Sequence, residues 1–240
     1  MLLELNKISF SYGDTKVLKE ISFTGDRGQV IALIGENGAG KSTTIKNIVR
    51  YLTPDSGNIL FDGKDIFKIN IENYPLSYVP DTPIFYEELS LLEHLHFMKA
   101  IYPHNNVIVD DILDRMELRE HLNKIPSALS KGTRQKLMIA MALLREYEII
   151  VLDEPFSGLD PKQIAMLKDT ILQEAEQGKL VLLSSHLLDL VENLCDRYVI
   201  IKNGTIIADG TKEELLSKAN MDFGSTMESV YLNLVGLYDE

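Results

Sequence analysis

The strongest constraint on the fold of this chain is the glycine-rich segment 35–42, Gly-Glu-Asn-Gly-Ala-Gly-Lys-Ser. It follows a continuous apolar run, residues 30–34, of the kind found in strands buried on both faces of a sheet. A helix is expected to follow over residues 41–52. Strand, glycine loop and helix in this order make a phosphate-binding loop, because the loop N–H groups and the positive end of the helix face phosphate oxygens. The segment therefore predicts a P-loop nucleotide-binding fold.

Polar side chains at the end of this loop and of a second predicted strand have expected roles. Lys41 is expected to reach the β- and γ-phosphates, and Ser42 to ligate Mg²⁺. The apolar segment 149–152 predicts another buried strand, and Asp153 and Glu154 follow it directly. Asp153 is then placed for the Mg²⁺ water shell, and Glu154 for activating the water that attacks the γ-phosphate. These two segments alone predict a bound nucleotide with Mg²⁺, although the second segment by itself also fits a strand that ends in a solvated acidic turn.

The composition limits the possible partners. The chain has 240 residues, 45% hydrophobic and 25% charged, as in a folded globular protein. A net charge of -12 disfavours a nucleic-acid partner, which usually needs a basic face. Cys195 is the single cysteine, so a disulfide framework is excluded and a reducing compartment fits. The N-terminus lacks the pattern of a signal peptide, and no apolar run approaches the roughly 18 to 20 residues that span a bilayer. Any role at a membrane is therefore expected to depend on a partner.

Strands and helices are expected to alternate on either side of a helical block. Alternating apolar residues predict two N-terminal strands, with a slip in register between Leu5 and Ile8. Alternation of strand and helix after the block indicates a largely parallel α/β core. The expected parts are an ATP-binding α/β core in residues 1–82 and 146–210, an inserted helical subdomain in 83–145, and a C-terminal helical extension in 211–240. Further expected elements are strands over 58–61, 76–79 and 180–184, helices over 161–176 and 187–195, and a hairpin around Asn203-Gly204.

A third motif lies inside the helical block. Residues 129–135, Leu-Ser-Lys-Gly-Thr-Arg-Gln, resemble the signature loop of the nucleotide-binding subunits of ATP-binding cassette (ABC) transporters. That loop is usually Leu-Ser-Gly-Gly-Gln. Here Ser130 and Gly132 are kept, whereas Lys131 replaces the first glycine and Thr133 replaces the glutamine. Ser130 also suits the N-cap of the helix that follows, and a helix start is a natural phosphate site. Without the resemblance, Ser130 would fit a plain capping residue equally well.

Other motifs of the family follow in the family's order, from about residue 2 to residue 210. Tyr12 matches the aromatic residue that stacks on adenine, residues 157–160 match the D-loop, and His186 matches the switch histidine that contacts the γ-phosphate. By themselves, Tyr12 and His186 also fit a tyrosine at a strand end and an ordinary histidine at a helix start. The resemblance implies catalytic roles for Glu154, His186 and Lys41. The nucleotide contacts that it implies are Tyr12, Val17, Gly35, Asn37, Gly38, Ala39, Gly40, Lys41, Ser42, Thr43, Ser130 and Gly132.

The resemblance also implies a fold and an assembly. The implied fold class is α/β, with a P-loop NTPase (RecA-like) core, an N-terminal antiparallel β subdomain and an inserted α-helical subdomain that carries the signature loop. The implied function is an ATPase that powers substrate translocation by an ABC transporter. In this family two nucleotide-binding subunits clamp two ATP molecules, and each signature loop faces the phosphate loop of the other subunit. The expected partners are therefore a second nucleotide-binding subunit, identical or different, and a transmembrane permease subunit that holds the chain at the cytoplasmic face of the membrane.

The direction of transport and the rate of turnover are less constrained. Residues 226–234 resemble the C-terminal segment of ATPases of bacterial ABC-type exporters, which favours export. The alternatives are a nucleotide-regulated module with little turnover and a soluble ABC-type ATPase outside transport. Glu154 and His186 argue against the first alternative. The single cassette and the negative charge argue against the second.

One segment departs from the family pattern. Asp81, within residues 78–83, stands where the family has a glutamine that ligates Mg²⁺ and senses the γ-phosphate. A carboxylate also ligates Mg²⁺, so Asp81 is expected to join Ser42 and Asp153 at the metal; alternatively, it caps a turn between two prolines. The apolar residues 84–86 follow directly. They suit the groove that receives a short helix of the membrane subunit, and they suit equally the core of the helical block.

Overall fold

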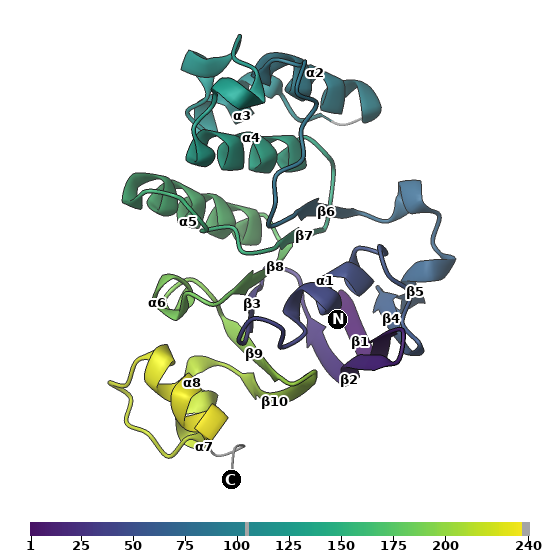
Figure 1. Cartoon of the computed structure of the whole chain (residues 1–240), viewed down its shortest axis with the longest axis vertical. Coiled ribbons are helices and arrows are strands. Elements are labelled where there is room, and N and C mark those ends of the chain that lie inside the picture. The colour runs from purple at the N-terminus through teal and green to yellow at the C-terminus, as the bar shows by residue number, and fades with distance from the viewer. Residues whose placement is uncertain (104–105, 237–240) are drawn as a thin grey trace.

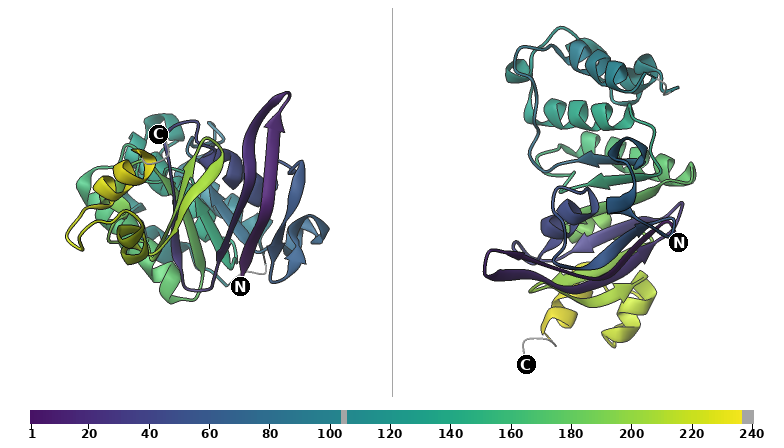
Figure 2. Two further views of the ribbon diagram at one scale, coloured as in Figure 1. Left: turned by 90° about the horizontal axis from the view of Figure 1, so that it is seen from below. Right: turned by 90° about the vertical axis from the view of Figure 1, so that its right-hand side faces the viewer.

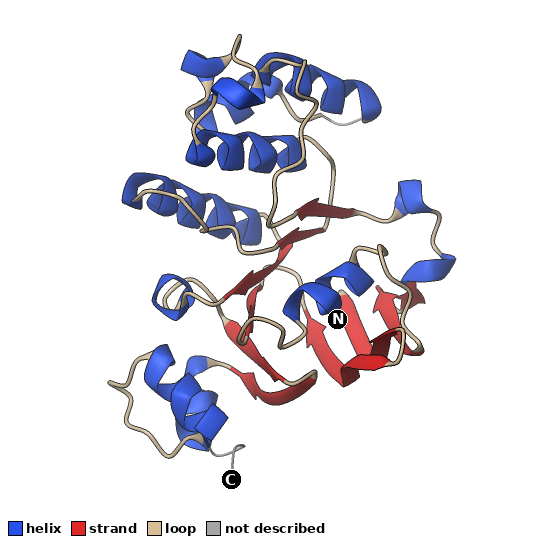
Figure 3. Cartoon of the chain, viewed as in Figure 1, coloured by secondary structure: helices blue, strands red, loops and turns tan. Residues whose placement is uncertain are grey.

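The computed structural model of the chain describes residues 1–103 and 106–236. This part of the chain forms two β-sheets, a helical block and a C-terminal group of helices (Figure 1, Figure 3). The helical block lies at one end of the molecule and the C-terminal helices at the other, with the sheets between them (Figure 1). In the described ranges no helix has both the length and the apolar composition that a membrane span requires.

The central sheet is largely parallel, as the sequence predicts. Its strand order is β10-β9-β3-β8-β7-β6, and only β10 runs antiparallel to its neighbour. The Asn203-Gly204 turn joins β9 to β10, which confirms the predicted hairpin. The strands are β3 (Val30–Ile34), β6 (Leu76–Val79), β7 (Ile149–Leu152), β8 (Leu180–Ser185), β9 (Arg197–Lys202) and β10 (Thr205–Gly210).

The second sheet is antiparallel and comes from the N-terminal part of the chain. Its order is β2-β1-β4-β5, and the pairing of the first two strands shifts between Leu5 and Ile8, where the sequence predicts a slip. The strands are β1 (Leu3–Tyr12), β2 (Thr15–Gly25), β4 (Ser56–Phe61) and β5 (Lys64–Asp65). Figure 2 shows the long β1–β2 hairpin, in dark purple, beside the central sheet. The predicted antiparallel β subdomain is therefore confirmed.

Helices account for most of the remaining elements. The helical block contains α2 (Leu91–Ile101), α3 (Val109–Arg115) and α4 (Lys131–Leu143). The other α-helices are α1 (Lys41–Ile48), α5 (Pro161–Glu176), α6 (Leu188–Val191), α7 (Lys212–Lys218) and α8 (Met227–Gly236). Single 3-10 turns occupy Ile66–Lys68, Ile71–Asn73, Arg119–His121 and Pro126–Ala128.

Two helices are shorter than the sequence predicts. The helix expected over 41–52 ends at Ile48, because Arg50 adopts a left-handed φ of 64° and the N–H groups of Tyr51 and Leu52 both donate to the carbonyl of Lys46. The helix expected over 187–195 is reduced to α6, Leu188–Val191. The Tyr198 hydroxyl donates to the Glu192 carbonyl at 2.6 Å and competes there with the helical ladder.

Alternate residues of the parallel strands face two separate cores. Val30, Ala32 and Ile34 of β3 belong to the core shared with the helical block and α5 to α8, whereas Ile31 and Leu33 belong to the core shared with α1 and the antiparallel sheet. Both faces of the sheet are therefore covered, as the continuous apolar runs predict. The carboxyl ends of β3, β7 and β8 carry the P-loop, Asp153 and His186 on one edge of this rigid sheet.

We propose the division of the chain that the sequence predicts: a core in residues 1–82 and 146–210, a helical subdomain in 83–145, and an extension from 211. Residues 104–105 of the predicted subdomain and 237–240 of the predicted extension lie outside the described residues.

Candidate nucleotide-binding site

The P-loop joins β3 to α1 through a backbone that requires glycine. Gly40, the N-cap of α1, has a φ of 115°, which side chains rarely tolerate. A methyl group on its Cα would also lie 2.9 Å from Cδ2 of Leu18. Gly40 therefore lets the chain enter α1 directly from the loop. The N–H of Gly204 donates to the Ala39 carbonyl at 2.9 Å, which ties the loop to the β9–β10 turn.

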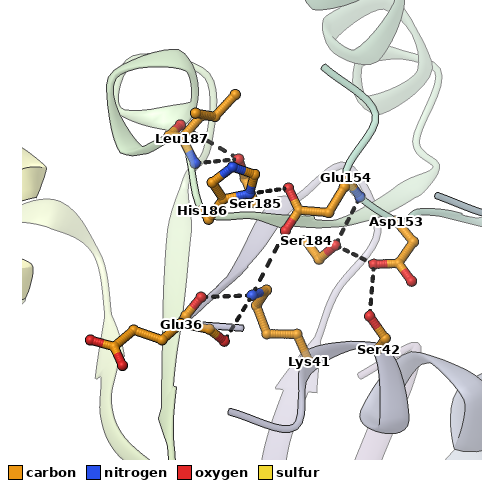
Figure 4. Close-up of polar contacts among 10 residues, drawn as sticks. Glu36, Lys41, Ser42, Asp153, Glu154, Ser184, Ser185, His186 and Leu187 are labelled. Carbon is orange, nitrogen blue, oxygen red and sulfur yellow. Dashed lines mark hydrogen bonds and ion pairs between the residues drawn. The ribbon is translucent and has the colours of Figure 1, made fainter. Parts of the chain in front are cut away.

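The Lys41 side chain is buried and lies along the loop (Figure 4). Its Nζ donates to the carbonyl oxygens of Gly35 at 2.6 Å and Glu36 at 3.2 Å. It also lies 3.7 Å from Oε1 of Glu154. The ammonium group therefore lies between the loop and the carboxylate that ends β7, where the sequence expects phosphate.

Asp153 is held by two hydroxyl groups. Ser184 Oγ donates to Asp153 Oδ1 at 2.5 Å, and Ser42 Oγ donates to the same oxygen at 3.4 Å (Figure 4). Burial raises the pKa of the Asp153 carboxyl, and the charges of Glu154 and Asp81 raise it further, while the two hydroxyl donors lower it. A bound cation would remove this electrostatic cost, because it stabilises the ionised form.

Ser184 is a site residue that the sequence analysis does not identify. Its Oγ bonds Asp153 and also accepts from the backbone N–H of Glu154 at 2.9 Å. It thus fixes both acidic residues at the end of β7 from the neighbouring strand. Ser184 directly follows the apolar run of residues 180–183, two positions before His186, and nothing in the sequence alone relates it to Asp153.

Glu154 and His186 are in direct contact. Nδ1 of His186 lies 2.8 Å from Oε2 of Glu154. The Glu154 side chain is 15% exposed and that of His186 is 50% exposed. Glu154 has a φ of 47°, a strained conformation of the kind that occurs at functional sites. The carboxylate is held between Lys41 and His186, where it can accept a proton from a bound water.

The remaining predicted nucleotide contacts lie around the P-loop and differ in their solvent exposure. Tyr12 is 47% exposed, and its ring is nearly perpendicular to that of Phe10, with 4.9 Å between the ring centroids, so part of the ring is accessible to a base. Val17 is half-buried, Asn37 and Gly38 are exposed, and Thr43 is half-buried in the first turn of α1. These placements are compatible with nucleotide contacts.

The signature residues lie apart from this cluster. Ser130 caps α4, because its Oγ accepts from the N–H of Thr133 at 3.1 Å and bonds the Thr133 hydroxyl at 2.8 Å. The capping role is therefore present whatever else Ser130 does. Within residues 1–103 and 106–236, no hydrogen bond or ion pair joins Ser130 or Gly132 to residues 35–43.

Asp81 lies near the acidic end of β7. Its charge contributes to the raised pKa values of Asp153 and of Tyr78, so the two aspartates interact electrostatically. The Asp81 side chain is exposed and makes no hydrogen bond within the part of the chain that the structure describes. The alternative role as a turn cap thus has no supporting contact.

Residues 84–86 divide between the two predicted roles. Phe85 packs against the core of the helical block, whereas Ile84 is 78% exposed and Tyr86 is 55% exposed. His94, fully buried, accepts from the Tyr86 N–H through Nε2 at 3.1 Å and so fixes this segment on α2. Beside it lies a groove of about 340 Å³, whose lining includes Tyr51, Ile71, Tyr78, Ile84, Met98 and Met141.

A P-loop at the end of the central parallel strand β3, with acidic residues at the end of β7 beyond the intervening β8, defines the class of this protein: it is a P-loop NTPase. The comparisons with known proteins narrow the class. The chain belongs to the ABC transporter family, whose model matches residues 18–157.

Relatives of known structure or name cover almost the whole chain. It is 37% identical to the ABC-type transporter ATP-binding protein EcsA of Bacillus subtilis (strain 168), over 97% of this chain and 96% of that protein. It is 30% identical to the SkfA peptide export ATP-binding protein SkfE of the same organism, over 87% of this chain and 88% of that protein. A solved ATP-binding subunit of an ABC transporter superposes with a TM-score of 0.91 at 36% identity, covering 98% of this chain and 100% of that one. The chain is thus an ATP-binding and ATP-hydrolysing subunit that powers transport.

Proposed function

We propose that two copies of this chain close on two ATP molecules, and that each copy hydrolyses the ATP held by its own P-loop. The cluster of Lys41, Glu154 and His186 carries this proposal. One carboxylate lies 3.7 Å from the lysine Nζ through one oxygen and 2.8 Å from the imidazole through the other. This places a proton acceptor beside two groups suited to a γ-phosphate.

Each member of the cluster has its own role. Glu154 accepts the proton of the attacking water. Lys41 turns from the loop carbonyls to the β- and γ-phosphates, and His186 donates to the γ-phosphate from its exposed edge. Tyr12 stacks on the adenine, and the backbone N–H groups of residues 37–43 surround the phosphates.

The residues present fit a magnesium ion bound together with the nucleotide. Ser42 Oγ and Asp153 Oδ1 lie 3.4 Å apart, close enough to be adjacent ligands, and Asp81 is the proposed third residue. Among the described residues there is no group of three or more His, Cys, Asp or Glu side chains able to hold a metal. That arrangement suits Mg²⁺, which usually keeps waters and phosphate oxygens as its other ligands. The ion would supply neutralisation of phosphate charge.

The signature loop completes the site of the other copy. Ser130 and Lys131 are exposed at the start of α4, while Gly132 is buried behind them. Since Ser130 and Gly132 make no contact with their own P-loop, a second copy is the source of phosphate for them. Hydrolysis then requires two chains, which makes ATP turnover dependent on dimer closure.

The groove of about 340 Å³ is the proposed docking site of the permease. It adjoins the exposed side chains of Ile84 and Tyr86, and the exposed carboxylates of Glu87 and Glu88 follow them directly. The lining is mostly apolar, with Arg145 as its charged residue, and suits a short helix that presents mainly apolar side chains. Docking there would hold the chain at the cytoplasmic face of the membrane.

Export is the direction that the available likenesses favour. The relative SkfE is a peptide export ATP-binding protein. The exporter-like residues 226–234 coincide with most of α8, which packs through Met227, Val230 and Leu234 onto the main core.

Complementation between two inactive variants tests the composite site. Lys41→Ala removes the phosphate lysine, and Ser130→Arg blocks the signature loop. If sites are shared between copies, a mixture of the two variants contains one intact site per mixed dimer and regains ATP turnover that neither variant has alone. Ser127→Arg, at an exposed serine of the same segment, is the control and should keep wild-type turnover. A mixture without turnover would contradict the proposal.

A further inference from the structure

Lys131, the residue that departs from the family's signature loop, lies against the loop that follows Glu154. A methyl group on the Cα of Gly158 would lie 2.5 Å from Cε of Lys131, and 2.6 Å from Cδ and from Nζ. The aliphatic stem of Lys131 therefore covers the backbone at Gly158. Gly158 has a φ of 75°, so a glycine is favoured there for conformational reasons as well.

Two further contacts join α4 to the same loop. Gln135, which is buried, donates through Nε2 to the Pro155 carbonyl at 3.3 Å. Gly132 lies against Gln163, since a methyl group on Gly132 would come within 3 Å of the Gln163 amide. Gln163 in turn forms the capping box of α5 with Asp160. The first turns of α4 thus contact the loop between Glu154 and α5 at Pro155 and Gly158, and the first turn of α5 at Gln163.

The charge of Lys131 has no counterpart among the residues that the structure describes. Within residues 1–103 and 106–236, Lys131 forms no ion pair and no hydrogen bond through its side chain. Its observed contact is made by the stem, which packs on Gly158. A glycine at position 131, which is usual in the family, has no side chain that could make this contact.

We propose that Lys131 is a positioning residue that connects the signature loop to Glu154. Its stem keeps residues 155–160 against α4. A nucleotide held by the P-loop of the second copy contacts Ser130 and Gly132 of this copy. That contact then orders residues 155–160 beside the Glu154 carboxylate of this copy. This inference rests on the proposed composite site. The packed unit of α4 and residues 155–160 connects the two ATP sites of a dimer. The nucleotide at each site therefore affects the arrangement of this unit.

Three substitutions in the full chain separate the stem from the charge. Lys131→Met keeps the stem without the charge, Lys131→Gly removes both, and Lys131→Arg keeps the charge. For each variant, steady-state ATP turnover gives kcat and the Hill coefficient, calorimetry gives the ATP affinity of the single chain, and thermal unfolding gives stability. Lys162→Gly, in the first turn of α5, is the control because that lysine is exposed and its Nζ pairs with Glu117, outside residues 155–160.

Lys131→Met should keep kcat within about twofold of the wild type, because the stem is retained. Lys131→Gly should lower kcat by about fivefold or more and bring the Hill coefficient towards one, while the ATP affinity of the single chain stays unchanged. Lys162→Gly should behave as the wild type in kcat and Hill coefficient.

Three results would overturn the role of Lys131. In the first, Lys131→Gly keeps both kcat and the Hill coefficient. In the second, Lys131→Met fails as badly as Lys131→Gly while Lys131→Arg is active, so that the charge is what matters. In the third, Lys131→Gly lowers the unfolding temperature and kcat but leaves the Hill coefficient unchanged. A wild-type chain without ATP turnover would instead overturn the proposed function itself.

Discussion

The Glu154 carboxylate and the His186 imidazole are joined by a contact of 2.8 Å, although they end different strands of the central sheet. The other oxygen of the same carboxylate lies 3.7 Å from Nζ of Lys41. The carboxylate therefore lies between the lysine ammonium and the imidazole, where it can accept a proton from a bound water. The contact therefore supports Glu154 as the base of the hydrolysis.

Replacing Glu154 with Gln tests this role with little change of shape. The amide cannot accept the proton of water, so turnover should fall by about 10²- to 10⁴-fold. ATP binding should remain, since the P-loop and Lys41 are unchanged. Phosphate release measures the first effect and equilibrium binding of ATP the second. Glu148→Gln, at the other end of β7, is the control, and equal turnover in Glu154→Gln and the wild type would refute the assignment.

Replacing Asp153 with Asn should stabilise the fold while removing activity. Burial raises the pKa of Asp153, so the ionised carboxylate costs folding free energy at neutral and alkaline pH. That cost is lost as the pH falls through the raised pKa, because the folded state then takes up a proton. The unfolding temperature of Asp153→Asn should exceed that of the wild type at pH 8, and the difference should shrink as the pH falls through the raised pKa.

The two effects of Asp153→Asn have separate readouts. Thermal unfolding without Mg²⁺ reports the stability, and Mg²⁺-dependent turnover reports the function. An active site that stores an electrostatic cost is expected to become more stable when the costly group is removed. A lower unfolding temperature of Asp153→Asn at pH 8 would show that the hydroxyl donors Ser184 and Ser42 outweigh burial.

Local sequence patterns predict much of this site, but they do not predict the contacts between its strands. β7 and α5 have the predicted bounds, because an apolar run determines the strand and the capping residue Asp160 with Pro161 determines the helix start. Ser184 meets Asp153 only because β7 pairs with β8, with Leu152 opposite Leu183. The order of strands in a sheet involves residues far apart in the chain, so no local pattern identifies Ser184.

The same limit applies to the other unpredicted contacts. Lys131 reaches Gly158 because α4 packs beside the loop before α5, a relation between two separate segments. The helix predicted over 187–195 is wrong beyond Val191, where Tyr198 from the following strand bonds the Glu192 carbonyl. In each case the observed structure depends on a contact with another element, which the local sequence preference does not include.

Substitution of Asp81 tests the third metal residue. If Asp81 ligates Mg²⁺, Asp81→Ala should raise the Mg²⁺ concentration for half-maximal ATP turnover by about tenfold. Asp81→Asn should have a smaller effect, because its amide oxygen can still ligate the ion. Asp55→Ala, at another exposed aspartate, is the control. An unchanged Mg²⁺ dependence in both Asp81 variants would remove Asp81 from the metal site.

Glu174 is expected to be important for stability, because it joins the helical block to the core. Its buried carboxylate accepts from NH1 of Arg115 at 2.7 Å and from the Tyr147 hydroxyl at 2.5 Å. Glu174→Ala leaves both donors without this partner and should cost about 3 to 5 kcal/mol of unfolding free energy. Urea unfolding measures the loss. The exposed Glu176, two residues further along α5, gives the control Glu176→Ala, and equal stability of the two variants would contradict the expectation.

Substitution of Ile84 tests the docking groove without disturbing the fold. Ile84 is 78% exposed, so Ile84→Asp should leave the unfolding temperature unchanged and the ATP turnover of the purified chain within about twofold of the wild type. Burial of a carboxylate in an apolar interface is costly, so the variant should no longer co-sediment with native membranes that retain the wild type. Phe223→Asp is the control, because Phe223 is 82% exposed near α8, away from the groove. Equal membrane retention of Ile84→Asp and the wild type would exclude this groove as the docking site.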